Sequence, residues 1–240
     1  MKDAQLIAST VLREHKKTEF AALVPNKHGA IAAWNAGIRR ITYVVSASEA
    51  HNLANVNRTV RQSMDELKDI MSEKKNFKIN FALATVFGCP FQGKVGIDDV
   101  LDIIRQGKAL GVENICLSDT IGIADPMQMQ HTLEIIGNEF ELSGFSLHLH
   151  NTRGMGLANS VVALQCGIFK FETAIGGLGG CPFVPGAAGN VATEDFVHML
   201  EAMDIKTGID LQLLLNTVDR IKKEVRTELN SCLSRMVQKC

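Results

Sequence analysis

Short apolar segments alternate with amphipathic segments along the chain, and this alternation is the strongest constraint on its fold. The apolar segments have the length of buried β-strands, and the segments between them have the spacing of amphipathic helices. Strands that alternate with helices form right-handed βαβ units and therefore a parallel sheet. We predict an α/β protein with strands at residues 20–24, 41–45, 79–86, 115–118, 145–150 and 169–175.

Turn and capping residues mark the limits of the predicted helices. Gly37, Gly111 and Gly167 stand where a helix should end, just before the next strand. Asp125 followed by Pro126 is typical of a helix start. The chain itself opens with a helix-like segment. We predict helices at residues 27–36, 54–73, 97–110, 126–140 and 155–165, and two more after the last strand at 193–203 and 210–229.

Polar residues follow each predicted strand, which is informative about the architecture. Functional groups at the carboxyl ends of successive parallel strands are typical of a TIM barrel. A doubly wound sheet concentrates its ligands at one switch point and usually has a phosphate loop, and no such loop follows the first strand. We therefore favour a TIM (β/α)8 barrel with six of its eight strands identified. No linker interrupts the chain, so we predict a single domain over residues 1–240, with C-terminal helices over about 193–240.

Composition excludes several classes of protein. The 240 residues can bury one large core, and a hydrophobic content of 46% is ordinary for a globular protein. A formal net charge of −1 predicts neither a nucleic-acid partner nor binding to an acidic membrane surface. No apolar run approaches the ~20 residues of a transmembrane helix. The six cysteines form no CxxC pair and resemble reduced thiols, so we predict a cytoplasmic protein.

Two histidines at the end of a predicted strand are the first candidates for chemistry. His148 and His150 stand two residues apart, and alternate side chains of a strand point to the same face. Both imidazoles can therefore face one metal ion, although an isolated pair of this kind is more often structural. Here a glycine-rich loop containing Cys181 and Asn190 follows the next strand, and this combination favours a metal site.

Other polar residues at strand ends have two interpretations each. Asp119 either caps the turn that follows it or takes part in catalysis, and Glu49 either caps a helix or lines the site. Cys89, in a Gly-Cys-Pro turn, either shapes its loop or serves the chemistry. Cys181 on its own would be a buried small thiol, and its glycine-rich surroundings favour a functional role.

Six motifs, in chain order, closely resemble those of the 3-hydroxy-3-methylglutaryl-CoA lyase family. The resemblance covers residues 22 to about 213, and several consecutive motifs in the same order make a chance similarity implausible. That family belongs to the metal-dependent TIM-barrel carbon–carbon lyases and Claisen-type synthases. The motifs are LVPN (23–26), SASEAHNLANVN (46–57), FGCPFQGKV (87–95), LSDTIGIADP (117–126), HLHNTRGMGLANS (148–160) and GLGGCPFVPGAAGNVATED (177–195).

The resemblance implies an activity and a cofactor. The family cleaves 3-hydroxy-3-methylglutaryl-CoA to acetyl-CoA and acetoacetate, a step of leucine catabolism, with a divalent metal such as Mg²⁺ or Mn²⁺. Carried over position by position, His148, His150 and Asn190 match three protein ligands of that metal. The implied partner is an acyl-CoA substrate. The sequence does not decide between a monomer and a homo-oligomer.

The resemblance also implies roles for three further residues. Cys181 matches the catalytic thiol that moves a proton near the cleaved bond. Asp119 matches an active-site acid, and Glu49 matches a polar residue near the mouth of the barrel.

Two departures from the family pattern shape the remaining expectations. Family members open with a strand that carries an Asp–Arg pair, and no such pair stands near the start of this sequence. We therefore expect an N-terminally incomplete chain that lacks the first βα unit and the second strand and is impaired as a lyase. Asn151 stands where the family commonly has Asp. The alternatives are a lyase or Claisen-type synthase for another 3-hydroxyacyl-CoA, such as citramalyl-CoA, or a non-catalytic barrel fragment.

Overall fold

The structure, a computed structural model, describes residues 3–73, 77–180, 189–225 and 229–236. Contacts within the chain divide it into two compact units. Unit 1 consists of Met1–Ser118 with Gly144–Ser146, and unit 2 consists of Asp119–Ser143 with Leu147–Cys240. The prediction of one domain over residues 1–240 stays a prediction.

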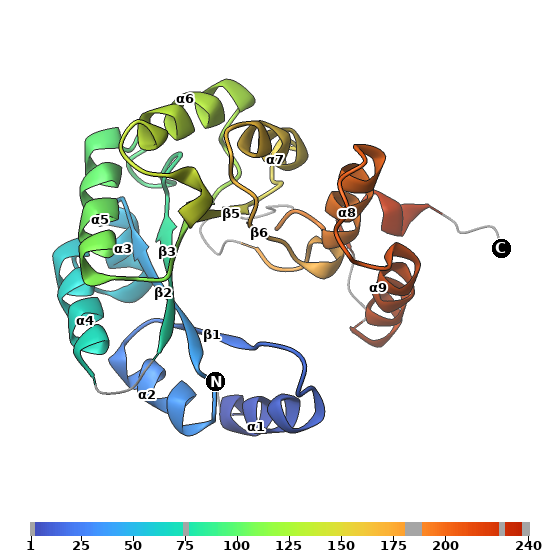
Figure 1. Cartoon of the computed structure of the whole chain (residues 1–240), viewed down its shortest axis with the longest axis horizontal. Coiled ribbons are helices and arrows are strands. Elements are labelled where there is room, and N and C mark those ends of the chain that lie inside the picture. Colours follow the sequence, from blue (N-terminus) through green and yellow to red (C-terminus); the bar gives the residue numbers. More distant parts are fainter. Residues whose placement is uncertain (1–2, 74–76, 181–188, 226–228, 237–240) are drawn as a thin grey trace. The chain divides into compact units, whose positions relative to one another are not determined.

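Unit 1 is built on parallel strands that pair in chain order. β1 pairs with β2 from Ala21 opposite Arg40, β2 pairs with β3 along their full lengths, and β3 pairs with β4. Figure 1 shows α4 and α5 side by side along one face of β2 and β3. The elements are α1 (Ala4–Glu14), β1 (Ala21–Val24), α2 (Lys27–Asn35), β2 (Arg40–Ser46), α3 (Glu49–Val56), α4 (Val60–Ser72), β3 (Lys78–Ala84), α5 (Ile97–Leu110) and β4 (Asn114–Asp119).

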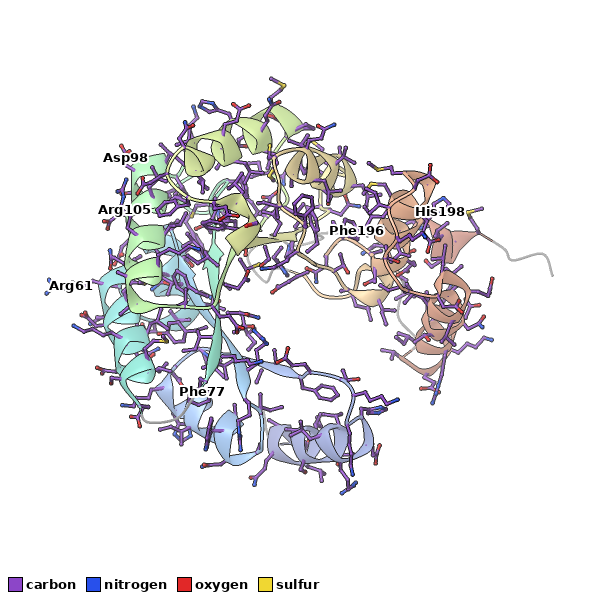
Figure 2. The ribbon with its side chains drawn as sticks, in the orientation of Figure 1. Arg61, Phe77, Asp98, Arg105, Phe196 and His198 are labelled. Carbon is purple, nitrogen blue, oxygen red and sulfur yellow. The ribbon has the colours of Figure 1, made fainter. Side chains whose placement is uncertain are left out.

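The core of unit 1 follows from the two-residue period of its strands. In β2 the side chains of Ile41, Tyr43 and Val45 are fully buried, while Thr42 and Val44 between them are only half-buried. On α5, Gly107 lets the helix approach β3 closely, because a Cβ at that position would lie 3.1 Å from the ring of Phe81. Polar side chains of α4 and α5 remain at the surface, as Figure 2 shows for Arg61, Asp98 and Arg105.

One predicted helix is wrong. The segment predicted as a single helix over residues 54–73 consists of the end of α3 and the separate helix α4. Asn57 ends α3 in the left-handed conformation, with φ of 55°. Thr59 and Gln62 then form a capping box that starts α4. The capping residues break the helix here, although the apolar residues on either side have a continuous helical spacing.

Unit 2 holds the remaining strands and helices. β5 pairs with β6 in parallel, with Leu147 opposite Phe171 and His148 opposite Glu172. Figure 1 shows α6 and α7 side by side within this unit. The elements are α6 (Pro126–Gly137), β5 (Phe145–Leu149), α7 (Gly156–Gln165), β6 (Phe171–Glu172), α8 (Thr193–Ala202), α9 (Leu211–Val225) and the short 3-10 turns Leu142–Gly144, Ile175–Gly177 and Leu233–Arg235.

The α/β class predicted from the sequence is confirmed. The strands of unit 1 pair in chain order, β5 pairs with β6 in unit 2, and the described residues contain the six strands expected. β6 is shorter than predicted, because the residues after Glu172 pair instead with the segment before α8, as in the bridge between Ala174 and Ala192. Among the described residues, no helix combines the length and apolarity needed to cross a membrane.

The single tyrosine of the chain lies in this core and makes the stability of unit 1 depend on pH. The Tyr43 hydroxyl lies 2.9 Å from Oε2 of Glu66 and 3.1 Å from the carbonyl oxygen of Ser63. Burial raises the pKa of Tyr43 above its ordinary value, and the Glu66 carboxylate raises it further. The unfolded chain loses this proton at about pH 10, whereas the folded chain retains it.

We therefore expect the free energy of unfolding to fall as the pH rises above about 10, because the unfolded state then binds fewer protons than the folded state. Urea melts followed between neutral and alkaline pH measure this change, and phenolate absorbance reports Tyr43 alone. Tyr43→Phe is the control and should lack this part of the pH dependence. Phenolate formation in the folded chain near pH 10 would contradict the burial of this hydroxyl.

Candidate active site

His148 on β5 and His150, the residue directly after the strand, lie side by side. The ring centroids of His148 and His150 lie 5.2 Å apart, with an angle of 54° between the ring planes. The side chain of His148 is 30% exposed, whereas His150 retains only 7% of its surface. The rings are neighbours, as the alternation of a strand predicts, so one ion could contact both.

Asn190 is held next to this pair through its backbone and oriented through its side chain. Asn190 and His150 form an antiparallel β-bridge. The Asn190 Nδ2 donates a hydrogen bond of 2.7 Å to the carbonyl oxygen of Leu178. Its Oδ1 is buried and has no hydrogen-bond partner among the described residues. The side-chain amide is therefore held in one orientation. Its oxygen, the kind of atom that a hard cation prefers, is available to bind a cation.

Glycines make this arrangement possible. A Cβ on Gly179 would lie 2.6 Å from Asn190 Nδ2, and a Cβ on Gly189 would overlap the carbonyl oxygens of Gly177 and Gly179. Gly177, Gly179 and Gly189 all have positive φ, of 66°, 100° and 83°. Side chains at these positions would push the two ends of the glycine-rich loop apart.

Burial keeps His150 in the form that binds a metal. Burial lowers the pKa of His150 to about 4, and the neighbouring His148 lowers it as well. The imidazole is therefore neutral at pH 7, with a lone pair on one nitrogen. The Nδ1 of His150 is buried and has no hydrogen-bond partner among the described residues. Nδ1 of His150 and Oδ1 of Asn190 are therefore both buried without a hydrogen-bond partner among the described residues, and a bound cation would supply that partner.

The candidate ligands lack a carboxylate of their own. In the part of the chain that the structure describes, no three His, Cys, Asp or Glu side chains are grouped so that they could hold a metal ion. His148, His150 and Asn190 supply two imidazoles and one amide oxygen, none of which carries a negative charge. A cation at these three side chains would keep its full charge for an anionic substrate and for water.

Asp119 organises the loop after β4. One carboxylate oxygen accepts the N–H of Ile123 at 3.0 Å, and the other accepts the N–H of Ala124 at 3.1 Å. Burial raises the pKa of Asp119, while these donors and nearby Arg153 act in the opposite direction. The backbone oxygen of Asp119 accepts the N–H of His150 at 3.3 Å. The structure thus supports the capping interpretation, and catalysis by Asp119 stays a prediction.

The remaining candidate residues lie in unit 1 or outside the described residues. Glu49 belongs to unit 1, where its Oε2 accepts the N–H of Val60 at 2.9 Å and so caps α4. Cys181 lies outside the described residues. Cys89, also in unit 1, accepts the N–H groups of Phe91 and Gln92 with its Sγ, at 3.3 and 3.5 Å, and thereby shapes its own loop.

Asn151 anchors the segment that follows β5. Its backbone N–H donates a hydrogen bond of 2.8 Å to the carbonyl oxygen of Gly189. Its Oδ1 accepts a hydrogen bond of 2.9 Å from the N–H of Gly156, at the start of α7. A carboxylate oxygen can accept the same bond, so this contact can be made by Asn or by Asp.

One residue near the pair was not singled out by the sequence analysis. The Nδ1 of His148 lies 3.1 Å from Oε2 of Glu172, on the neighbouring strand β6. The sequence signal was available, because Glu172 is the one acidic residue in the predicted strand at 169–175. Its partner could be identified only once the register of β5 and β6 was known.

The chain is similar to several known proteins. The HMGL-like family profile matches residues 2–221. The chain is 42% identical to the hydroxymethylglutaryl-CoA lyase YngG of Bacillus subtilis over 96% of this chain and 78% of that protein. It is 40% identical to the (R)-citramalyl-CoA lyase of Chloroflexus aurantiacus over 83% of this chain and 64% of that protein.

A solved structure has the same fold. It is an HMG-CoA lyase from Acinetobacter baumannii in complex with coenzyme A and 3-methylmalate. It is 36% identical in sequence and superposes with a TM-score of 0.93, covering 99% of this chain and 78% of that one. The likeness confirms the TIM-barrel class predicted for these strands.

Parallel βα repeats with imidazoles and an amide at the strand ends define the class, that of the TIM-barrel enzymes. Within this class the chain belongs to the HMGL-like family, a family of carbon–carbon lyases.

The cap made by Glu49 leads to a stability prediction that separates its two interpretations. Glu49→Ala should lower the free energy of unfolding by about 0.5–1 kcal/mol, because the N–H of Val60 loses its acceptor. Glu49→Gln keeps an acceptor oxygen and should lose less. Urea melts of both variants measure the difference.

Asp65→Ala is the matched control for this experiment, because Asp65 is an exposed carboxylate on α4 itself. It should change stability by less than about 0.5 kcal/mol. Unchanged stability of Glu49→Ala together with a loss of turnover would place Glu49 in the active site instead.

Proposed function

We propose that this chain cleaves 3-hydroxy-3-methylglutaryl-CoA into acetyl-CoA and acetoacetate with the help of a divalent metal, Mg²⁺ or Mn²⁺. One observation carries the proposal for this member of the lyase family. The paired rings of His148 and His150 adjoin Asn190, whose amide oxygen is buried and has no partner among the described residues.

The metal would be held by His148, His150 and Asn190. A bound divalent cation supplies Lewis-acid stabilisation of substrate oxygens and a template for orienting them. The three side chains are neutral, so the remaining charge of the cation is available to a carboxylate or carbonyl of the substrate. Two imidazoles and an amide oxygen suit Mg²⁺ or Mn²⁺ when a carboxylate and water molecules complete the coordination shell.

In this proposal the residues of the chain hold the substrate and move its protons. The 3-hydroxyl group gives its proton to a base, for which Asp119 is the candidate by its place in the LSDTIGIADP motif; the bond between C2 and C3 breaks, and acetoacetate leaves with the new carbonyl. The electron pair remains as the enolate of acetyl-CoA, which is then protonated at carbon. We assign this proton to the thiol of Cys181, by its place in the GLGGCPF motif.

Two aspects of the setting belong to the same proposal. The substrate is an acyl-CoA, supported by the relative of known structure that holds coenzyme A. We place the reaction in the cytoplasm and in leucine catabolism. The thiols of Cys89, Cys116, Cys166 and Cys232, the described cysteines, are free of disulfides, which suits a reducing compartment.

A second candidate substrate is supported by one comparison. The relative from Chloroflexus aurantiacus, at 40% identity, is an (R)-citramalyl-CoA lyase. Cleavage of citramalyl-CoA also yields acetyl-CoA, but the other product is pyruvate. The two substrates differ in the acid that leaves, so they are distinguished by the product.

The activity test is release of acetyl-CoA from each of the two substrates with Mg²⁺ or Mn²⁺ present. It is made on the chain as printed and on the chain preceded by the leading segment of the Bacillus subtilis lyase, where the family resemblance expects the Asp–Arg pair. From the extended chain we expect metal-dependent release that favours 3-hydroxy-3-methylglutaryl-CoA and stops on chelation, and from the chain as printed we expect little release. Preference for citramalyl-CoA would replace the first substrate by the second, and no release from either substrate by the extended chain would contradict the proposal.

Three variants divide the roles within the site. His148→Ala should weaken metal binding and thereby abolish most turnover. Cys181→Ala should lower kcat by about 10²–10⁴ and leave Mn²⁺ affinity unchanged, because it removes a proton-transfer group but no ligand. His198→Ala is the matched control, since His198 is exposed on α8, on the side of the helix away from the buried Phe196 (Figure 2). Full turnover in Cys181→Ala would contradict its assignment.

A further inference from the structure

A carboxylate on β6 faces one of the two candidate metal-binding histidines. The Oε2 of Glu172 lies 3.1 Å from Nδ1 of His148, and both side chains are partly exposed, at 40% and 30%. The distance is that of a hydrogen bond between an imidazole N–H and a carboxylate oxygen.

The sheet places this pair, so the contact is not a chance meeting of two surface side chains. β5 and β6 run parallel with His148 directly opposite Glu172, and residues opposite each other on neighbouring strands point to the same face. Phe171 points to the other face, where its ring lies 5.0 Å from the ring of Phe196 on α8.

The residues after Glu172 are tied to the segment that carries Asn190. The Thr173 hydroxyl lies 2.9 Å from the hydroxyl of Thr193, and the N–H of Ala174 donates to the carbonyl oxygen of Val191 at 3.1 Å. β6 is therefore held between β5, which carries His148, and the Asn190 segment. This fixes the backbone position of Glu172 next to the imidazole.

We propose that Glu172 is a positioning residue that holds His148 with the proton on Nδ1, leaving the lone pair on Nε2 for the metal. A carboxylate accepts hydrogen bonds and does not donate them, so the nitrogen facing it must carry the proton. Metal-binding histidines commonly donate their second nitrogen to a carboxylate, which fixes the tautomer and raises the basicity of the ligand nitrogen. This inference rests on the proposed metal site.

Glu172 also changes the charge balance of the site. The three candidate ligands are neutral, and Glu172 contributes one negative charge through the imidazole that it contacts. His150 differs, because its buried Nδ1 has no hydrogen-bond partner in the described part of the chain. Glu172 therefore acts on His148, and its loss should affect one ligand of the three.

The first test reads the tautomer directly in the metal-free chain. Long-range ¹H–¹⁵N spectra of protein labelled at histidine distinguish a protonated from an unprotonated ring nitrogen, and His148→Ala identifies the signals of His148. We expect the Nδ1–H form in the wild-type chain and in Glu172→Gln, which keeps an acceptor oxygen. Glu172→Ala should shift the population toward the Nε2–H form.

The second test measures Mn²⁺ affinity by calorimetry on the same proteins. Glu172→Ala should bind Mn²⁺ about 10–100-fold more weakly, and Glu172→Gln should recover part of that loss. Glu201→Ala, which removes an exposed carboxylate of α8 in the same unit, is the matched control and should bind like the wild type.

The outcomes separate this inference from the proposed function. A wild-type chain that binds no Mn²⁺ contradicts the metal site, and the tautomer of His148 still decides whether Glu172 positions the ring. An unchanged tautomer in Glu172→Ala overturns the inference. A loss of affinity with an unchanged tautomer overturns it as well, because Glu172 would then act by its charge or as a ligand and not through His148.

Discussion

The pairing of the Asn190 segment with the end of β5 is the interaction on which the candidate site depends. Two backbone hydrogen bonds form the bridge between His150 and Asn190: the N–H of Asn151 donates to the oxygen of Gly189 at 2.8 Å, and the N–H of Val191 donates to the oxygen of Leu149 at 3.1 Å. Residues some forty positions apart in sequence thus become neighbours. Without this pairing the two histidines would remain a pair of imidazoles on a strand, with no amide oxygen beside them.

Glycine makes that pairing sterically possible, and hydrogen bonds then hold it. Gly177, Gly179 and Gly189 adopt positive φ, and two of them would collide with neighbouring backbone or with Asn190 if they carried a Cβ. Before this cluster, the N–H of Gly176 donates to both oxygens of the fully buried Glu194, at 3.1 and 3.0 Å. The Gly-rich motif therefore has a structural explanation in the residues around Cys181, independent of any role for the thiol.

The local features of the fold could be predicted from the sequence, whereas contacts between strands could not. The apolar periods predicted each strand to within a few residues, and the two-residue spacing predicted that His148 and His150 share a face. The break between α3 and α4 was missed because Thr59 and Gln62 were not read as a capping box. Glu172 was missed because its partner depends on the register of β5 against β6, which no local pattern reveals. Asp119 and Glu49 were each left with two interpretations, and the structure shows the capping contact in both.

The central claim is that His148, His150 and Asn190 share one divalent cation. Anomalous diffraction from crystals soaked in Mn²⁺ tests it most directly, since the signal locates the ion without reference to activity. The account predicts one strong peak whose neighbours are a ring nitrogen of each histidine and Oδ1 of Asn190, at about 2.0–2.6 Å. A peak bound by other side chains, or none at these three at saturating Mn²⁺, would contradict it.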